Sequence, residues 1–144
     1  MGFFMDTMTV YNYKREADGE YWKRTVVHGV QWRHGKRRMT AKEGVFTDEP
    51  EESITIDFDR QYEDNKPYLD PMAYQKLSAG QADDYWTLDP HNGMDIAACG
   101  EIRQEVNTDY GISRLRKEYP AFTVAAVSDN RNRPRLKHIR AVAK

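Results

Sequence analysis

The chain has 144 residues, of which 39% are hydrophobic and 31% charged, with a formal net charge of −1 at pH 7. This length suits one domain, so residues 1–144 are expected to fold as a single unit, with residues 1–6 as an N-terminal arm. The single cysteine, Cys99, excludes an internal disulfide and a zinc site built on cysteine pairs. No apolar run approaches the roughly 20 residues that a membrane-spanning helix needs, so no membrane partner is expected.

The small net charge hides a strong division of charge along the chain. Residues 1–47 carry nine Lys or Arg and five Asp or Glu, residues 48–95 carry three and thirteen, and residues 96–144 carry ten and five. Such asymmetry can steer one copy of the chain onto another, or onto a charged partner. The alternative interpretation is that these charges lie on solvated surface loops.

The first part of the chain predicts a β-hairpin. Residues 7–14 and 21–32 are rich in β-forming residues, and Asp18–Gly19 between them is a strong hairpin turn signal. Gly29, inside the second predicted strand, indicates a bulge or the close approach of another backbone.

The pattern then weakens before a third clear strand. His34–Gly35 is typical of a turn, and a short strand is predicted at 37–39. Residues 41–52 contain Pro50 within an acidic run, so they are predicted to form a loop. Residues 53–58 alternate between apolar and polar side chains, which predicts a strand.

The remaining elements are short, and the predicted fold class is mainly β. Few leucines and many aromatic residues favour a small barrel or sandwich with one or two short helices and long loops. In chain order we expect a long loop at 59–70, a helix that starts at Asp70–Pro71 and ends at Gly80, a brief strand at 85–88, a turn before Met94, a strand at 95–99, a helix at 109–118, and a final hairpin of strands 121–127 and 135–142.

No arrangement of residues typical of an enzyme is visible. His28, His34, His91 and His138 do not follow metal-ligand spacing, and we place the first and last in strands and the other two in turns. Cys99 lies in an apolar segment that favours a buried structural thiol over a nucleophile. We therefore predict no catalytic residue, no cofactor and no metal.

The charged clusters are the better candidates for function. Two basic segments, 33–38 and 131–140, could contact nucleic-acid backbone or protect hairpin edges from unwanted pairing. They could also meet an acidic surface, such as residues 48–64 of a neighbouring copy. The residues expected at a subunit or partner interface are Arg33, Lys36, Arg37, Arg38, Asp48, Glu49, Glu51, Glu52, Asp59, Glu63, Asp64, Arg131, Arg133 and Arg135.

Three stretches of the chain resemble one protein family. They are YWKRTVVHGVQW at 21–32, YWTLDPHNGMDIAACGEI at 85–102, and the ending from Phe122 to Lys144. They are similar to an early strand, a turn with its following strand, and the final hairpin of head-closure (stopper) and neck proteins in tailed phages of Gram-positive hosts. The chain departs from that pattern in a longer turn and in Ala98, where a basic residue is common, so the subfamily stays open.

The resemblance implies a structural protein of the virion neck, made in the host cytoplasm. Such proteins form a homo-oligomeric ring below the portal and adaptor rings, close the DNA-filled head and dock the tail terminator or tail tube. Non-specific contact with packaged DNA is a further implied contact. The alternatives are another neck protein, namely the tail terminator or the adaptor, and a small nucleic-acid-binding β-barrel.

Overall fold

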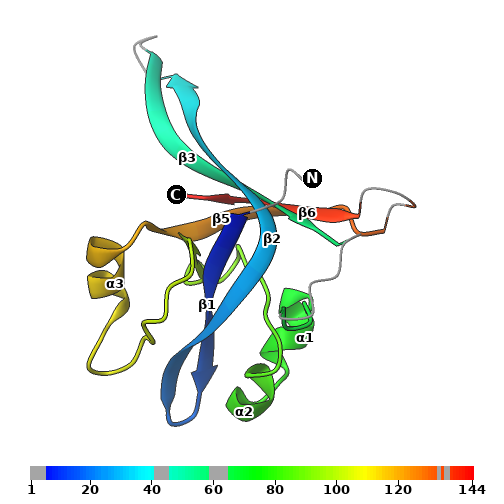
Figure 1. The fold of residues 1–144 in the computed structure, drawn as a ribbon. Coiled ribbons are helices and arrows are strands. Elements are labelled where there is room, and N and C mark those ends of the chain that lie inside the picture. Colours follow the sequence, from blue (N-terminus) through cyan, green and yellow to red (C-terminus); the bar gives the residue numbers. More distant parts are fainter. Residues whose placement is uncertain (1–5, 41–45, 59–64, 133, 135–136) are drawn as a thin grey trace.

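A computed structural model describes residues 6–40, 46–58, 65–132, 134 and 137–144, with side chains at these positions except 36–40 and 46–50. Its strands form a closed barrel in the order β1-β2-β3-β6-β5-β4, all antiparallel (Figure 1). The fold is therefore mainly β and a barrel rather than a sandwich. The elements are β1 Asp6–Glu16, β2 Gly19–Thr40, β3 Phe46–Asp57, α1 Pro71–Gln75, α2 Ala79–Ala82, β4 Ile96–Cys99, α3 Ile112–Glu118, β5 Ala121–Asp129 and β6 His138–Ala143.

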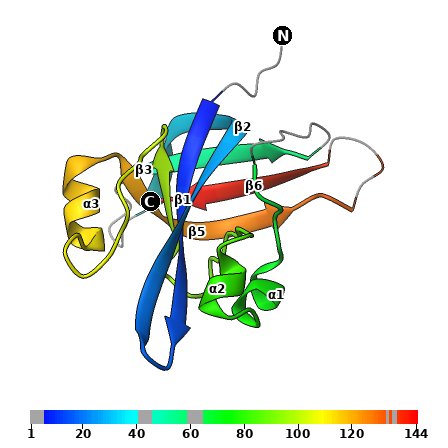
Figure 2. The same ribbon diagram turned by 60° about the horizontal axis from the view of Figure 1, so that its bottom comes forward.

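The two faces of the barrel wall pack two different cores. Val10 and Ala97 belong to the larger buried cluster, whereas their chain neighbours Tyr11 and Ala98 belong to a second cluster with Leu115 of α3. This follows from the two-residue repeat of a strand, which sends successive side chains to opposite faces. Accordingly α3 lies on one side of the barrel, and α1 and α2 lie on the other side of the β1–β2 hairpin (Figure 2).

The first predicted hairpin is confirmed. β1 and β2 pair from Glu16↔Gly19 through Thr7↔His28, and the register then shifts by one residue at Gly29. Gly29 has φ 77°, a backbone conformation that favours glycine. The bulge expected at this residue is therefore confirmed.

Two predictions for the next segment are wrong. His34–Gly35 is not a turn, because β2 continues through it to Thr40, and residues 46–52 are not loop, because they form the start of β3. Local signals were weak here, and pairing between the two long strands decided the structure instead. Residues 41–45 and the first part, 59–64, of the loop predicted at 59–70 lie outside the described residues.

Pro50 fits inside β3 because of the direction its nitrogen faces. The Trp32 N–H donates to Asp6 Oδ2 at 2.9 Å, so it points away from β3. Ile54, which pairs with Trp32, therefore directs its N–H away from β2. Because this direction alternates along a strand, the backbone nitrogen of Pro50, four residues earlier, also faces away from β2. No bond to β2 is lost by having proline there, which is the edge position that a strand tolerates.

The far ends of β2 and β3 form a two-stranded extension that we call the arm, residues 35–40 and 46–51. The ladder between β3 and β6 begins only at Glu52↔Ala143, so the described strands of the arm pair with each other alone. Figure 1 shows the arm leaving the barrel at the end opposite the β1–β2 turn.

The second half differs from prediction mainly in its helices. Asp70 precedes a helix as expected, but that helix stops at Gln75, and Gly80 lies inside α2 rather than ending the first helix. Ser78 starts α2 with a capping box to Gln81, which restarts the helix after a break. None of the described helices has the length and apolar character to cross a bilayer.

The other predicted elements are confirmed in type and shifted in extent, except the strand predicted at 85–88, which is not formed. The strand at 85–88 is reduced to one bridge between Trp86 and Tyr68, and α3 begins at Ile112. Its late start has a cause, because the Asn107 side chain accepts from the N–H groups of residues 109 and 110 and holds a turn there. The turn before Met94, the strand ending at Cys99 and the final hairpin of β5 and β6 are present.

Candidate functional site

The basic and acidic clusters predicted to serve different subunits meet on one hairpin. In the register of β2 and β3, Arg37 pairs with Glu49 and Arg38 with Asp48, while Lys36 lies across from Pro50. Opposite charges at directly opposed positions stabilise a strand pair. Two runs of charged residues that are separate in the sequence therefore occupy paired positions within one chain.

Glu52 is buried at the base of the arm, with 5% of its surface exposed. Its Oε1 accepts from Trp32 Nε1 at 3.3 Å and contacts His34 Nδ1. Glu52 thus anchors the arm to the barrel instead of standing free at a surface. His34 lies in β2 and not in the expected turn.

Arg131 is held within its own chain. Its guanidinium contacts both carboxylate oxygens of Asp129, with the shortest distance 2.7 Å, and reaches Asp70 Oδ1 at 2.5 Å. It also lies 4.7 Å from the centre of the Tyr68 ring. These contacts raise the pKa of Arg131 further and tie the β5–β6 turn to the start of α1. Arg133, with Arg135, Asp59, Glu63 and Asp64, lies outside the described residues.

Arg33 is exposed, and it borders a hollow of about 520 Å³ on the outer face of β2, β3 and β6. Glu51 lines the same hollow at the base of the arm. Across it lies Arg140, whose Nε donates to Ser53 Oγ at 3.3 Å. Two guanidinium groups therefore flank a floor of small polar side chains. Arg33 and Glu51 were among the predicted interface residues, and Arg140 was not.

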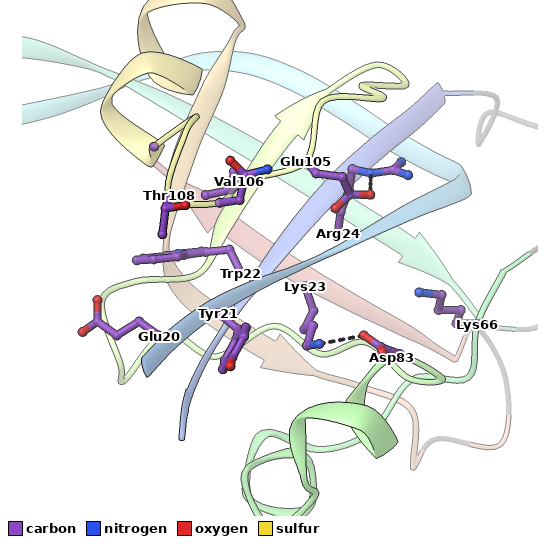
Figure 3. Close-up of a pocket in the computed structure, with 12 residues that line it drawn as sticks. Glu20, Tyr21, Trp22, Lys23, Arg24, Lys66, Asp83, Glu105, Val106 and Thr108 are labelled. Carbon is purple, nitrogen blue, oxygen red and sulfur yellow. Dashed lines mark hydrogen bonds and ion pairs between the residues drawn. The ribbon is translucent and has the colours of Figure 1, made fainter. Parts of the chain in front are cut away.

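A larger hollow, of about 780 Å³, runs along the outer edge of β2 and was not predicted (Figure 3). Its floor is the consecutive run 20–24, and its walls come from Lys66 and Asp83 on one side and the segment 105–111 on the other. The only local signal was an unusual mixture of aromatic and charged residues on both faces of one strand.

Two ion pairs bridge the strand to the walls of this hollow. Lys23 Nζ lies 2.9 Å from Asp83 Oδ1, and Arg24 Nε lies 2.8 Å from Glu105 Oε1. Figure 3 shows Trp22 and Arg24 directed toward the 105–108 wall and Tyr21 and Lys23 toward α2. Because neighbouring side chains separate to opposite walls, the backbone edge of β2 lies between them.

The turn before β4 is organised by a buried carboxylate, Asp95, which is 1% exposed. One oxygen accepts from Asn12 Nδ2 at 2.9 Å and Asp89 N at 3.0 Å. The other accepts from Tyr13 N at 2.8 Å and Asn92 Nδ2 at 3.0 Å. Burial raises the pKa of Asp95 to about 6, although the hydrogen bonds act to lower it. All the donors belong to the chain itself, so this carboxylate shapes the turn.

The described residues offer little for metal or nucleophilic chemistry. They contain no group of three or more His, Cys, Asp or Glu side chains arranged to hold a metal ion. Cys99 is half-buried rather than fully buried, and desolvation raises the pKa of its thiol, which disfavours the reactive thiolate.

No curated protein and no solved structure matches the chain. One family model does match, over residues 3–144, which span the whole barrel, the arm and all three helices. The chain therefore belongs to the family of unknown function DUF6751.

Proposed function

We propose that the chain is a structural subunit of the head–tail connector of a tailed bacteriophage. In this proposal it forms a ring at the virion neck, below the portal and adaptor rings, closes the DNA-filled head and docks the tail. It acts by assembly and carries out no reaction. The stretches that resemble head-closure proteins correspond to the first part of β2, the Asp95 turn with β4, and the β5–β6 hairpin; β4, β5 and β6 are adjacent in the barrel, and β1 and β3 separate them from β2.

The observation that carries the proposal is the arm. A two-stranded hairpin is marginally stable by itself in water, so one that extends from a barrel gains stability when a second surface covers it. A ring of identical subunits requires two different surfaces on each copy, one of which must reach the neighbour. The arm supplies an element that reaches away from the barrel, and its two strands pair with each other from Gly35↔Glu51 to Thr40↔Phe46.

The fold also helps to rank the alternatives. An adaptor is expected to be mostly helical, and this chain is mainly β, so the head-closure and terminator roles are favoured. A nucleic-acid-binding module rests on Arg33 and Arg140 beside the smaller hollow. It is the weaker candidate because Arg131, in the basic segment 131–140, already binds Asp129 and Asp70.

The test is to locate the chain and to remove the arm. Residues 36–50 are replaced by Asn-Gly, which joins the paired residues Gly35 and Glu51 through a two-residue hairpin turn. Labelled wild-type chain is expected in a cyclic ring at the neck of virions in electron micrographs. Phage lacking the gene should regain tailed particles with the wild-type chain and accumulate tail-less heads with the shortened one.

Thermal unfolding provides the matched control, because the shortened chain should keep its barrel and its cooperative transition. The chain found in the capsid shell, in a tail fibre or outside any particle would overturn the proposed function. Full rescue by the shortened chain would remove the arm as the assembly element.

A further inference from the structure

The outer edge of β2 carries main-chain groups that β1 does not use. Tyr13 N–H donates to Asp95 Oδ1 at 2.8 Å and so points away from β2. Its partner on β2 is Trp22, whose main-chain groups must then point away from β1. Hydrogen-bonding direction alternates along an antiparallel strand, so the residues that face the outer edge are Trp22, Arg24, Val26 and His28.

Both ends of this row are already covered by the chain itself. At one end the Asn65 side chain imitates a neighbouring strand: its Oδ1 accepts from His28 N at 2.9 Å, and its Nδ2 donates to His28 O at 3.0 Å. At the other end Val106 forms an antiparallel bridge with Trp22. These contacts show that the edge accepts strand-like partners.

Arg24 and Val26 lie between the two covers. In the part of the chain that the structure describes, no partner bonds the outward N–H and C=O groups of these residues. The larger hollow runs along the same edge, from Glu20 to Arg24, and reaches Lys66 next to Asn65 (Figure 3). Among the described residues, the structure therefore contains a slot of strand width whose floor carries main-chain donors and acceptors that no described residue bonds.

We propose that this slot receives residues 1–5 of a second copy of the chain by strand addition. The sequence there is MGFFM, which is apolar and leads directly into β1. In strand addition the main chain of the added segment bonds the open edge, and alternate side chains enter pockets beside it. Phe3 and Phe4 would then lie on opposite faces, one of them beside Trp22 and Val106.

The chain's own first residues do not have the length to fill the slot. Asp6 pairs with Val30 on the other edge of β2, four residues along the strand from Val26. Residues 1–5, fully extended from Asp6, span at most about 17 Å. The distance along β2 from Val30 to Val26 is about 13 Å, and the segment would also have to cross β2 to its other edge. The donor must therefore be another copy, which makes the contact head-to-tail and suited to ring closure.

This proposal shares one premise with the proposed function, namely that copies of the chain assemble with one another. The test uses two variants of the full chain. Val26→Pro removes an N–H that serves the outer edge and no bond to β1, as Pro50 does in β3. The double substitution Phe3→Ser and Phe4→Ser damages the donor and leaves the slot intact. Val26→Thr is the control, because it keeps the N–H and the β-branched shape.

Sedimentation equilibrium is expected to show self-association of the wild-type chain and of Val26→Thr, and its loss in each of the two other variants. Mixing those two should restore a single contact, from the intact donor of one to the intact slot of the other, and give a one-to-one dimer that does not grow. The dimer also shows that both variants are folded.

A wild-type chain that stays monomeric, self-association by Val26→Pro equal to wild type, or no dimer in the mixture would overturn the inference. The outcome is separate from that of the proposed function. Association through the slot can be measured without any virion, and the shortened-arm chain should still associate in the same way.

Discussion

The Asp95 turn and the outer edge of β2 differ in how fully their polar groups are hydrogen-bonded. At the turn, each carboxylate oxygen accepts from two donors, and side chains as well as main chain take part. At the edge, the outward main-chain groups of Arg24 and Val26 have no partner in the described part of the chain, although His28 and Trp22 on either side are covered. A buried polar group must be hydrogen-bonded within the chain, whereas the main-chain groups of an exposed strand edge remain available to another strand. The contrast separates a region built for stability from one available for binding.

The largest expected effect comes from breaking the turn. The substitution Asp95→Asn replaces one carboxylate oxygen by an NH2 group, which cannot accept a hydrogen bond. In one orientation of the amide the NH2 group faces the donors of Asn12 and Asp89, and in the other it faces those of Tyr13 and Asn92. Two buried donors then lose their acceptor and face another donor. This loss should lower the free energy of unfolding by about 3 to 5 kcal/mol. Urea denaturation followed by tryptophan fluorescence measures it.

Asp84→Asn is the matched control, since Asp84 is exposed and lies in the loop after α2. Its effect should stay within about 0.5 kcal/mol. Equal stability of the two variants would show that the Asp95 network does not hold the turn.

A second, smaller effect is expected from pH. The pKa of Asp95 is raised by burial from 3.8 to about 6 in the folded chain. The folded state then binds more protons than the unfolded state between these values, so this group's contribution to stability is present below pH 4 and is lost as the pH rises through 6. The slope is at most about 1.4 kcal/mol per pH unit.

Carbon-13 NMR of the Asp95 carboxyl provides the measurement, with an expected titration midpoint near 6. A midpoint below 4 would mean that the four donors outweigh desolvation. In that case the sign of the stability change would reverse.

The smallest effect tests the cover on the β2 edge. Asn65→Ala removes both bonds to His28 and extends the open row by one residue. The cost should be about 1 kcal/mol, because His28 is only half-buried and water can replace the amide. Amide hydrogen exchange at His28 should become faster while that at Val27, which bonds β1, stays slow. Unchanged exchange at His28 would show that Asn65 does not protect the edge.

Local patterns were sufficient for the elements whose signals are short-range. The turn at Asp18–Gly19, the alternation around Ile54 and the bulge at Gly29 depend on neighbours in the chain, and all are present. The prediction failed at residues 46–52, where Pro50 and a run of acids are typical of loops. Their partners lie six to eighteen residues away, at 34–40, and the local signals at 46–52 do not indicate that pairing.

The candidate site shows the same limit. The charged clusters could be found from composition, but not that Arg37 and Arg38 are the register partners of Glu49 and Asp48, nor that Arg131 is bound by Asp129. The β2 edge was invisible because it depends on which strands do not pair. The hollow beside it is formed by segments that lie about 40 to 90 residues away in the chain from the strand they flank.

The amino-acid sequence alone determined that this is a one-domain, strand-rich chain with divided charge, because strand propensity, turn chemistry and net charge are properties of near neighbours. Tertiary structure alone decided that the strands close into a barrel, that the basic and acidic runs of the arm lie at paired positions, and that one stretch of β2 has no main-chain partner on its outer edge among the described residues. Those outcomes depend on long-range pairing, in which the identity and register of distant partners decide whether a polar group is satisfied.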